Sequence, residues 1–194
     1  MNFLAHTFLS FSDQQIVGNL MGDFLKGFDR STLPPEIEKG IVLHMKIDEF
    51  TDSHREISKA KDIFRPQVRL YSGVLVDIVM DFFLANDPKI KSHTEWLSFS
   101  LHVYTVLEEN NRYLPEKLRS IVPRMKRENW LYDSRTLDGM KWSLNSIKRR
   151  ANFIEGDPNI FETFVDNMGK LQSHYDKFFP ELCAYITSEQ KKLR

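Results

Sequence analysis

The sequence has little cysteine, no net charge and no long hydrophobic run, and each of these features excludes a class of protein. Its single cysteine, Cys183, cannot form an internal disulfide, so a disulfide-framework domain is excluded and a reducing cytoplasm is expected. The first ten residues lack the basic and apolar regions of a secretion signal. The 27 Lys and Arg residues balance the 27 Asp and Glu residues, so no overall charge attracts the chain to nucleic acid or to a membrane surface. The longest apolar stretch, around residues 74–85, is interrupted by two aspartates and is too short for a membrane span.

The remaining composition is that of a globular helical protein. Hydrophobic residues make up 41% of the 194 residues and charged residues 28%, which excludes a disordered chain and fits one domain with a sizeable core. Apolar residues recur at three and four positions without sustained two-residue alternation, so we expect an all-α, compact, single-domain bundle over residues 1–194. The expected helices cover residues 2–9, 12–28, 36–51, 54–64, 68–85, 94–113, 115–122 and 134–151, with a long last helix from residue 157 that Pro180 kinks or splits.

Three of these predicted helices carry polar residues four positions apart on otherwise apolar faces. The pairs are Asn19 with Asp23, His44 with Asp48, and Asp77 with Asp81. Residues four apart lie on one face of a helix, so each pair is expected to point into the interior. Unpaired carboxylates are costly to bury, so these acids must be protonated, meet cations or hold a metal ion.

A structural role and a metal-binding role both fit any single pair. A buried aspartate can be held by an arginine, such as Arg149 or Arg150, or by the amides at a helix N-terminus, whereas three pairs together favour a shared metal site. Carboxylates with one or two imidazoles suit Mn²⁺, Mg²⁺ or Fe²⁺ better than thiolate-bound zinc. His6, at helical spacing from Phe3 and Leu9, is a further candidate ligand, although a core histidine with one hydrogen bond fits that position equally well.

One segment, Lys117 to Arg127, contains five basic residues and no acidic one. Most such runs are solvated faces, but this one can receive an acidic partner. The sequence contains no glycine-rich phosphate loop, no His-Glu-x-x-His motif and no nucleophile elbow. Metal-assisted chemistry at the acidic residues is therefore the best supported reaction type.

Several blocks of the sequence together form a recognisable pattern. They are Asn2-Phe3-Leu4-Ala5-His6, Gly18-Asn19-Leu20-Met21-Gly22-Asp23-Phe24 and His44-Met45-Lys46-Ile47-Asp48-Glu49-Phe50-Thr51-Asp52, with Asp77 to Leu84, Trp130-Leu131, Arg149-Arg150 and His174-Tyr175 further along. This pattern resembles the bacterial acyl-carrier-protein phosphodiesterase family. The resemblance implies an all-helical, divergent relative of the HD-type metal phosphohydrolases. It also implies removal of phosphopantetheine from holo acyl carrier protein with a divalent ion, preferably Mn²⁺.

The resemblance also implies roles for individual residues, because the acids of the three pairs, His44 and His6 all fall on family motif positions. The expected metal ligands are Asp23, His44, Asp77, Asp81 and His6. Asp23 and Asp48 are the expected catalytic residues, which orient or deprotonate water.

The substrate is expected to meet basic residues from two parts of the chain. Arg149 and Arg150 are the expected phosphate clamp, and Lys117 and Arg124 are expected to dock the acidic carrier protein.

One departure from the family pattern keeps two other functions open. The family usually reads Asp-His-Phe-Leu where this chain has Asp81-Phe82-Phe83-Leu84, so one imidazole is missing. No His-Asp dipeptide occurs, so the HD relationship depends on the resemblance alone. The alternatives are an HD-like phosphohydrolase acting on a nucleotide or another small phosphodiester, and a carrier-protein-binding domain that has lost catalysis.

Overall fold

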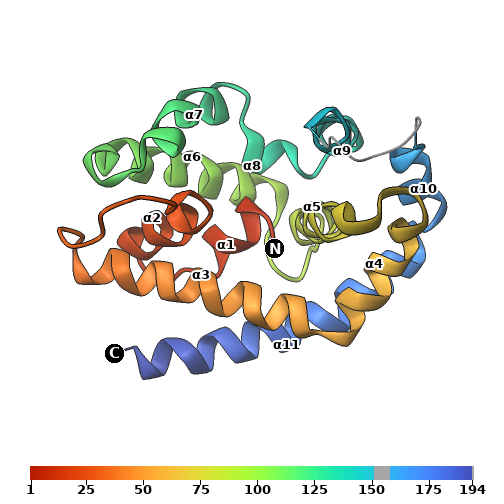
Figure 1. The fold of residues 1–194 in the computed structure, drawn as a ribbon, viewed down its shortest axis with the longest axis horizontal. Coiled ribbons are helices and arrows are strands. Elements are labelled where there is room, and N and C mark those ends of the chain that lie inside the picture. The colour runs from red at the N-terminus through yellow and green to blue at the C-terminus, as the bar shows by residue number, and fades with distance from the viewer. Residues whose placement is uncertain (151–157, 194) are drawn as a thin grey trace.

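The computed structural model describes residues 1–150 and 158–193, without the side chains of residues 148–150, and every regular element in this part is a helix (Figure 1). The α-helices are α1 (Phe3–Phe8), α2 (Asp13–Met21), α3 (Pro35–Ser53), α4 (Arg55–Val68), α5 (Ser72–Ala85), α6 (His93–Glu109), α7 (Glu116–Arg127), α8 (Trp130–Asp133), α9 (Leu137–Arg150), α10 (Ile160–Asp166) and α11 (Met168–Lys192). Short 3-10 helices cover Gly22–Phe24, Arg69–Tyr71 and Asn111–Tyr113. The predicted all-α fold is confirmed.

Local capping explains where two of the helices begin. The Ser12 hydroxyl accepts a hydrogen bond from the backbone N–H of Gln15 and starts α2, as the sequence predicts. The prediction for α6 is wrong by two residues, because Ser92 rather than Thr94 caps it. The hydroxyl of Ser92 accepts from the backbone of Glu95, whose carboxylate accepts in return from the Ser92 backbone.

Three other predicted boundaries are wrong. The second helix ends at Met21 rather than Phe28, because the chain tightens into a 3-10 turn and then adopts a left-handed conformation at Gly27, with φ of 74°. Proline does not end α4 at Pro66, nor does it divide α11 at Pro180; burial of the apolar faces of these helices outweighs the lost backbone hydrogen bond. The last segment instead divides at Asn167, between α10 and α11.

The helices form three layers (Figure 1). Helices α3, α4 and α11 lie along one side, α6 to α9 lie along the other, and α1, α2 and α5 lie between them. The central position of α5 follows from its sequence, which is apolar on nearly every face, and this helix contacts α1, α4, α9 and α11. None of the described helices combines the length and the apolar character needed to cross a membrane.

The backbones of α2 and α3 lie in near contact, which brings their polar residues together. A Cβ atom on Gly18 would lie only 1.9 Å from the carbonyl oxygen of Ile37, so only glycine fits there. This approach places Asn19 of α2 beside His44 of α3, where the backbone carbonyl of Asn19 meets the imidazole.

Candidate metal centre

Two histidines and an aspartate converge where α1, α2 and α3 meet. His6 comes from α1, His44 and Asp48 come from α3, and one ligand atom from each lies within 4.8 Å of the others. The Nε2 atom of His6 is 3.3 Å from Oδ1 of Asp48, and the Nε2 atom of His44 is 3.0 Å from Oδ2. The two rings stack with centroids 4.2 Å apart. A single carboxylate therefore faces two imidazoles.

Asn19 fixes which nitrogen of each imidazole faces Asp48. Its backbone carbonyl lies 2.8 Å from Nδ1 of His44, and a carbonyl only accepts, so this nitrogen carries the hydrogen. The side-chain amide of Asn19 donates to the carbonyl of His6 and to the Ser10 hydroxyl, which turns its oxygen toward Nδ1 of His6 at 2.7 Å. Both Nδ1 atoms therefore donate, and both Nε2 atoms point toward Asp48. Histidine ligands of metal ions are typically oriented in this way.

The charge states of these groups follow from burial and from their contacts. Burial lowers the pKa of His6 and favours its neutral form. Burial opposes ionisation of Asp48, but hydrogen bonds with His44 and His6 outweigh it and hold the pKa of this carboxyl well below its usual range. Burial also opposes protonation of His44, yet the contact with Asp48 raises its pKa overall. A neutral imidazole thus lies beside an ionised carboxylate, a donor set that suits a hard or borderline divalent cation.

Gly22 and Asp23 follow α2 directly and complete the exposed side of this cluster. A Cβ atom on Gly22 would lie 2.2 Å from the His44 ring, so a larger residue would displace the imidazole. The carboxylate of Asp23 is 57% exposed, and its Oδ1 atom is 3.6 Å from Nε2 of His44. The sequence-based expectation that Asp23 and His44 lie together agrees with this geometry.

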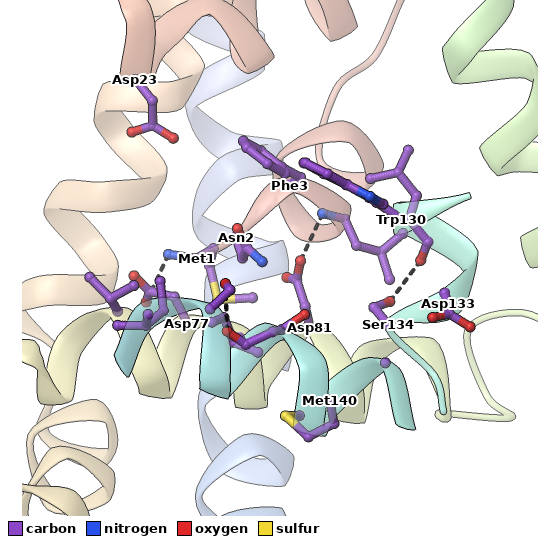
Figure 2. Close-up of a pocket in the computed structure, with 18 of the residues that line it drawn as sticks. Met1, Asn2, Phe3, Asp23, Asp77, Asp81, Trp130, Asp133, Ser134 and Met140 are labelled. Atoms are coloured by element: carbon purple, nitrogen blue, oxygen red, sulfur yellow. Dashed lines mark hydrogen bonds and ion pairs between the residues drawn. The ribbon is translucent and has the colours of Figure 1, made fainter. Parts of the chain in front are cut away.

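The two acids of α5 have other partners (Figure 2). The Oδ1 atom of Asp77 lies 3.1 Å from the amino nitrogen of Met1, which is itself 3.8 Å from Asp48. Asp81 is buried and accepts hydrogen bonds from the backbone N–H groups of Leu4, at 2.7 Å, and Ala5, at 3.2 Å. Burial raises the pKa of Asp81 to about 7, and those two amides oppose the shift.

These contacts correct the expected ligand set. Both oxygens of Asp81 are committed to the first turn of α1, which is the structural role that the sequence left open. Asp77 pairs with an amino group, and neither acid belongs to the cluster of His6, His44 and Asp48. The position of α1 depends on Asp81, so this residue acts on the cluster through His6.

A cavity of about 600 Å³ opens beside the cluster, and its size is typical of a site for a small organic group. Asp23, Asp48, Asp77 and Asp81 all line it. Residues at the start of the chain and of α3, α5, α7, α8 and α9 also line it, and Figure 2 shows Asp23 and Asp133 at opposite sides of the drawn residues. The cavity is therefore longer than the space beside Asp23, and Asp133 lies at its other side.

The basic residues expected at the substrate differ in their availability. Lys117 lines the cavity, is exposed, and forms no ion pair within the described part of the chain. Arg124 also lines the cavity, but its guanidinium bonds to Glu128. Arg149 and Arg150 are the last two residues of α9, and their side chains lie outside the described residues.

The position of the missing family histidine lies away from the cavity. The ring of Phe82 packs against those of Phe83 and Phe164, with centroids 5.5 and 5.3 Å apart, and it is not among the cavity-lining residues. His174 pairs internally with Glu56, at 2.8 Å. The phenylalanine at position 82 therefore removes no group from the cavity wall.

Sequence reasoning identified the polar residue Asn19 but not its orienting role. The signal in the sequence was an asparagine on an otherwise apolar helix face. The pattern alone could not show that this asparagine contacts two histidines on other helices. Trp130, which lines the cavity, entered only as part of the family resemblance, and the amino group of Met1 and the indole of Trp142 gave no signal at all. These groups become visible only when α1, α5, α8 and α9 are placed together.

Sequence comparisons relate the chain to one family of known proteins. The family described as acyl carrier protein phosphodiesterase matches residues 1–182. A similar protein, the acyl carrier protein phosphodiesterase of Klebsiella pneumoniae subsp. pneumoniae, is 29% identical, over 98% of this chain and 100% of that protein. Proteins of the same name from Photorhabdus laumondii subsp. laumondii and Escherichia coli O157:H7 are 28% and 26% identical, over 93% and 95% of this chain and 92% and 96% of their own lengths.

No solved structure matches the chain, so the expected relationship to HD-type enzymes stays a prediction. The family match, in contrast, extends over the residues of both the cluster of His6, His44 and Asp48 and the cavity. The chain belongs to the acyl carrier protein phosphodiesterase family.

Proposed function

We propose that this protein uses a divalent metal ion to hydrolyse the phosphodiester that joins phosphopantetheine to the serine of holo acyl carrier protein. The observation that carries the proposal is the convergence of His6, His44 and Asp48, with both Nε2 atoms turned toward the Asp48 carboxylate, beside a cavity in a chain of this family. Water adds to phosphorus and the serine oxygen leaves, which releases phosphopantetheine and restores the serine hydroxyl of the apo carrier protein. The cytoplasmic setting expected from the single cysteine stays a prediction.

The metal is assigned to His6, His44 and Asp48, with Asp23 beside them. Imidazole and carboxylate donors without a thiolate accept Mn²⁺, Mg²⁺ or Fe²⁺, and Mn²⁺ is the ion that the resemblance to the family implies. A bound ion of this kind would act as a Lewis acid that activates water and neutralises phosphate charge.

The protein's own side chains supply the other functions. Asp23 is exposed at the cavity, and within the described residues its carboxylate lies 3.6 Å from His44, so it is available to orient water or accept a proton. Lys117, also exposed at the cavity, is assigned to docking of an acidic carrier protein. Arg149 and Arg150 remain proposed phosphate contacts.

The experiment that tests this function combines metal analysis with a defined substrate. Purified protein is incubated with holo carrier protein and Mn²⁺, Mg²⁺ or a chelator, and the carrier protein is followed by mass spectrometry. We expect the apo form to accumulate with Mn²⁺ and not with the chelator. Hydrolysis of a nucleotide or a small phosphodiester with no action on holo carrier protein would favour the HD-like alternative. Carrier-protein binding without turnover in excess Mn²⁺ would favour the binding-only alternative.

Replacement of Asp23 by alanine tests the catalytic role that is proposed for this residue. We expect Asp23→Ala to lower the rate of carrier-protein hydrolysis by about 10²- to 10⁴-fold, the usual contribution of a general acid or base. Because the side chain is 57% exposed, the free energy of unfolding should change by less than about 0.5 kcal/mol. Chemical denaturation and the mass assay measure the two effects separately. A badly destabilised variant that is still active would show that Asp23 is a structural residue.

A further inference from the structure

The cavity extends well beyond the metal cluster. Its far part, here called the aromatic end, lies between α7, α8 and α9. The apolar side chains of Ile121, Trp130, Met140, Trp142 and Ile147 line it together with Arg124, Asp133 and three serines. In Figure 2, Trp130 and Met140 lie apart from Asp23. A metal ion and one phosphate group need only the acidic end, so the aromatic end is available to another part of a ligand.

The two tryptophans of the aromatic end contact each other and Arg124, and Trp130 is also held by a hydrogen bond. Their ring centroids are 5.8 Å apart, and the guanidinium of Arg124 lies 5.6 Å from each ring. Glu128 accepts from Nε of Arg124 and, at 2.9 Å, from Nε1 of Trp130. Glu128 therefore balances the charge of Arg124 locally, and the rings present a fixed apolar surface.

The exposure of Trp142 is unusual for so large an apolar side chain. It is 40% exposed although it lines the cavity and contacts Trp130. Large aromatic rings that remain exposed in a concave site are typical of binding surfaces.

The serine hydroxyls beside these rings are suited to the amide groups of a ligand. The hydroxyls of Ser134 and Ser146 line the cavity and donate to the backbone carbonyls of Leu131 and Ser143. Their donor hydrogens are used, so their oxygen atoms remain as acceptors for N–H groups of a ligand. A flexible chain that carries amide groups fits this combination of apolar rings and acceptors.

We propose that the aromatic end binds the pantetheine arm of the substrate and that Trp142 is a specificity-determining residue for the length of that arm. The inference rests on the proposed function, which places the phosphodiester at the acidic end. Beyond its phosphate the arm is uncharged, flexible and rich in amide groups, as the aromatic end requires. The cavity volume of about 600 Å³ is within the range of sites that enclose a group of this size.

The test compares two arms on the same carrier protein. One carrier protein has the full pantetheine arm, and the other has an arm that keeps the phosphodiester but lacks the terminal cysteamine unit. We expect Trp142→Ala to lower kcat/KM about tenfold for the full arm and less than about twofold for the shortened arm, because only the full arm contacts the ring. Leu137→Ala is the matched control on the same helix, since Leu137 is 49% exposed and does not line the cavity. This control should leave both values unchanged, and Trp142→Phe should recover most of the loss.

A binding measurement separates this inference from the proposed function. Calorimetric titration with free 4′-phosphopantetheine should give a Kd that rises about tenfold in Trp142→Ala. Should the wild type bind this compound through Trp142 but hydrolyse neither substrate, the proposed function fails and the inference stands. An active wild type whose Trp142→Ala variant loses nothing, or loses equally on both arms with unchanged Kd, overturns the inference. Absence of both hydrolysis and Trp142-dependent binding overturns both.

Discussion

At the scale of single residues, the orientation of each imidazole determines what the cluster can do. Asn19 holds both Nδ1 atoms as donors, and Asp48 meets both Nε2 atoms. Asp81 acts one step further away, because it accepts from the first turn of α1, the helix that carries His6. The site therefore depends on residues that touch neither the proposed metal nor the substrate.

The role of Asp81 predicts a positioning effect. In Asp81→Asn the new amide can keep one acceptor toward α1 but places N–H groups opposite a backbone N–H, so α1 should shift. We expect a loss of about 1–3 kcal/mol in the free energy of unfolding. We also expect Mn²⁺ affinity to fall by about 10- to 100-fold, the usual effect of removing a residue that orients a metal ligand. Denaturant titration and metal titration measure these values.

A control from the same cavity makes this prediction specific. Asp133 lines the cavity and is exposed on α8, and no histidine of the cluster depends on it. Asp133→Asn should leave Mn²⁺ affinity unchanged. If Asp81→Asn also binds Mn²⁺ as the wild type does, Asp81 has no positioning role.

At the scale of elements, the close approach of α2 and α3 places Asn19 against His44. The approach needs a residue without a side chain at Gly18, because the Ile37 carbonyl occupies the space of a Cβ atom. Gly22 has the same function against the ring of His44. Packing against α3 thus explains why glycine occurs at both positions 18 and 22.

This packing predicts opposite results for two glycine substitutions. In Gly18→Ala the Cβ atom would lie 1.9 Å from a backbone oxygen, so the helices must separate at a cost of about 1–3 kcal/mol or more. In Gly73→Ala, on α5, the nearest atom is the flexible end of Lys61 at 3.5 Å, so stability should be unchanged or should rise by less than about 1 kcal/mol. Thermal unfolding compares the two variants. Equal stability would mean that α2 and α3 do not need their close approach.

At the scale of the whole molecule, ion pairs join helices that are distant in sequence. Glu56 at the start of α4 is only 3% exposed; it pairs with Lys59 at 2.9 Å and reaches across to His174 of α11 at 2.8 Å. Hydrogen bonds from Lys59 and His174 lower the pKa of Glu56 from 4.5 to about 2. The ionised form is therefore the one that the folded protein favours.

The depressed pKa of Glu56 gives a pH dependence with a defined sign. Since the folded value is below the unfolded one, the pairs stabilise the fold fully above about pH 4.5, and this contribution is lost as the pH falls toward about 2. We expect Glu56→Gln to lower the thermal midpoint at pH 7, and the difference from the wild type to shrink between pH 4.5 and 2. Thermal unfolding scans of both proteins between pH 2 and pH 7 measure this difference in midpoint. A difference that is constant with pH would mean that the charge of Glu56 contributes nothing.

The sequence by itself determined the helical fold and the central position of α5, because apolar periodicity and capping residues act over a few neighbouring positions. It also identified Asp23, His44 and Asp48 as polar residues on apolar faces, and local spacing is enough for that. It misplaced the ends of helices at Phe28, Pro66 and Pro180, where local preferences compete with burial.

Only the tertiary structure decided how those polar residues divide their roles. A pattern four residues apart is the same for His44 with Asp48 as for Asp77 with Asp81, yet one pair faces His6 and the other meets the amides of α1 and the amino group of Met1. The difference depends on which helix lies opposite each pair, and that choice is made by contacts between residues far apart in sequence. The aromatic end of the cavity exists for the same reason, since α5, α7, α8 and α9 enclose it together.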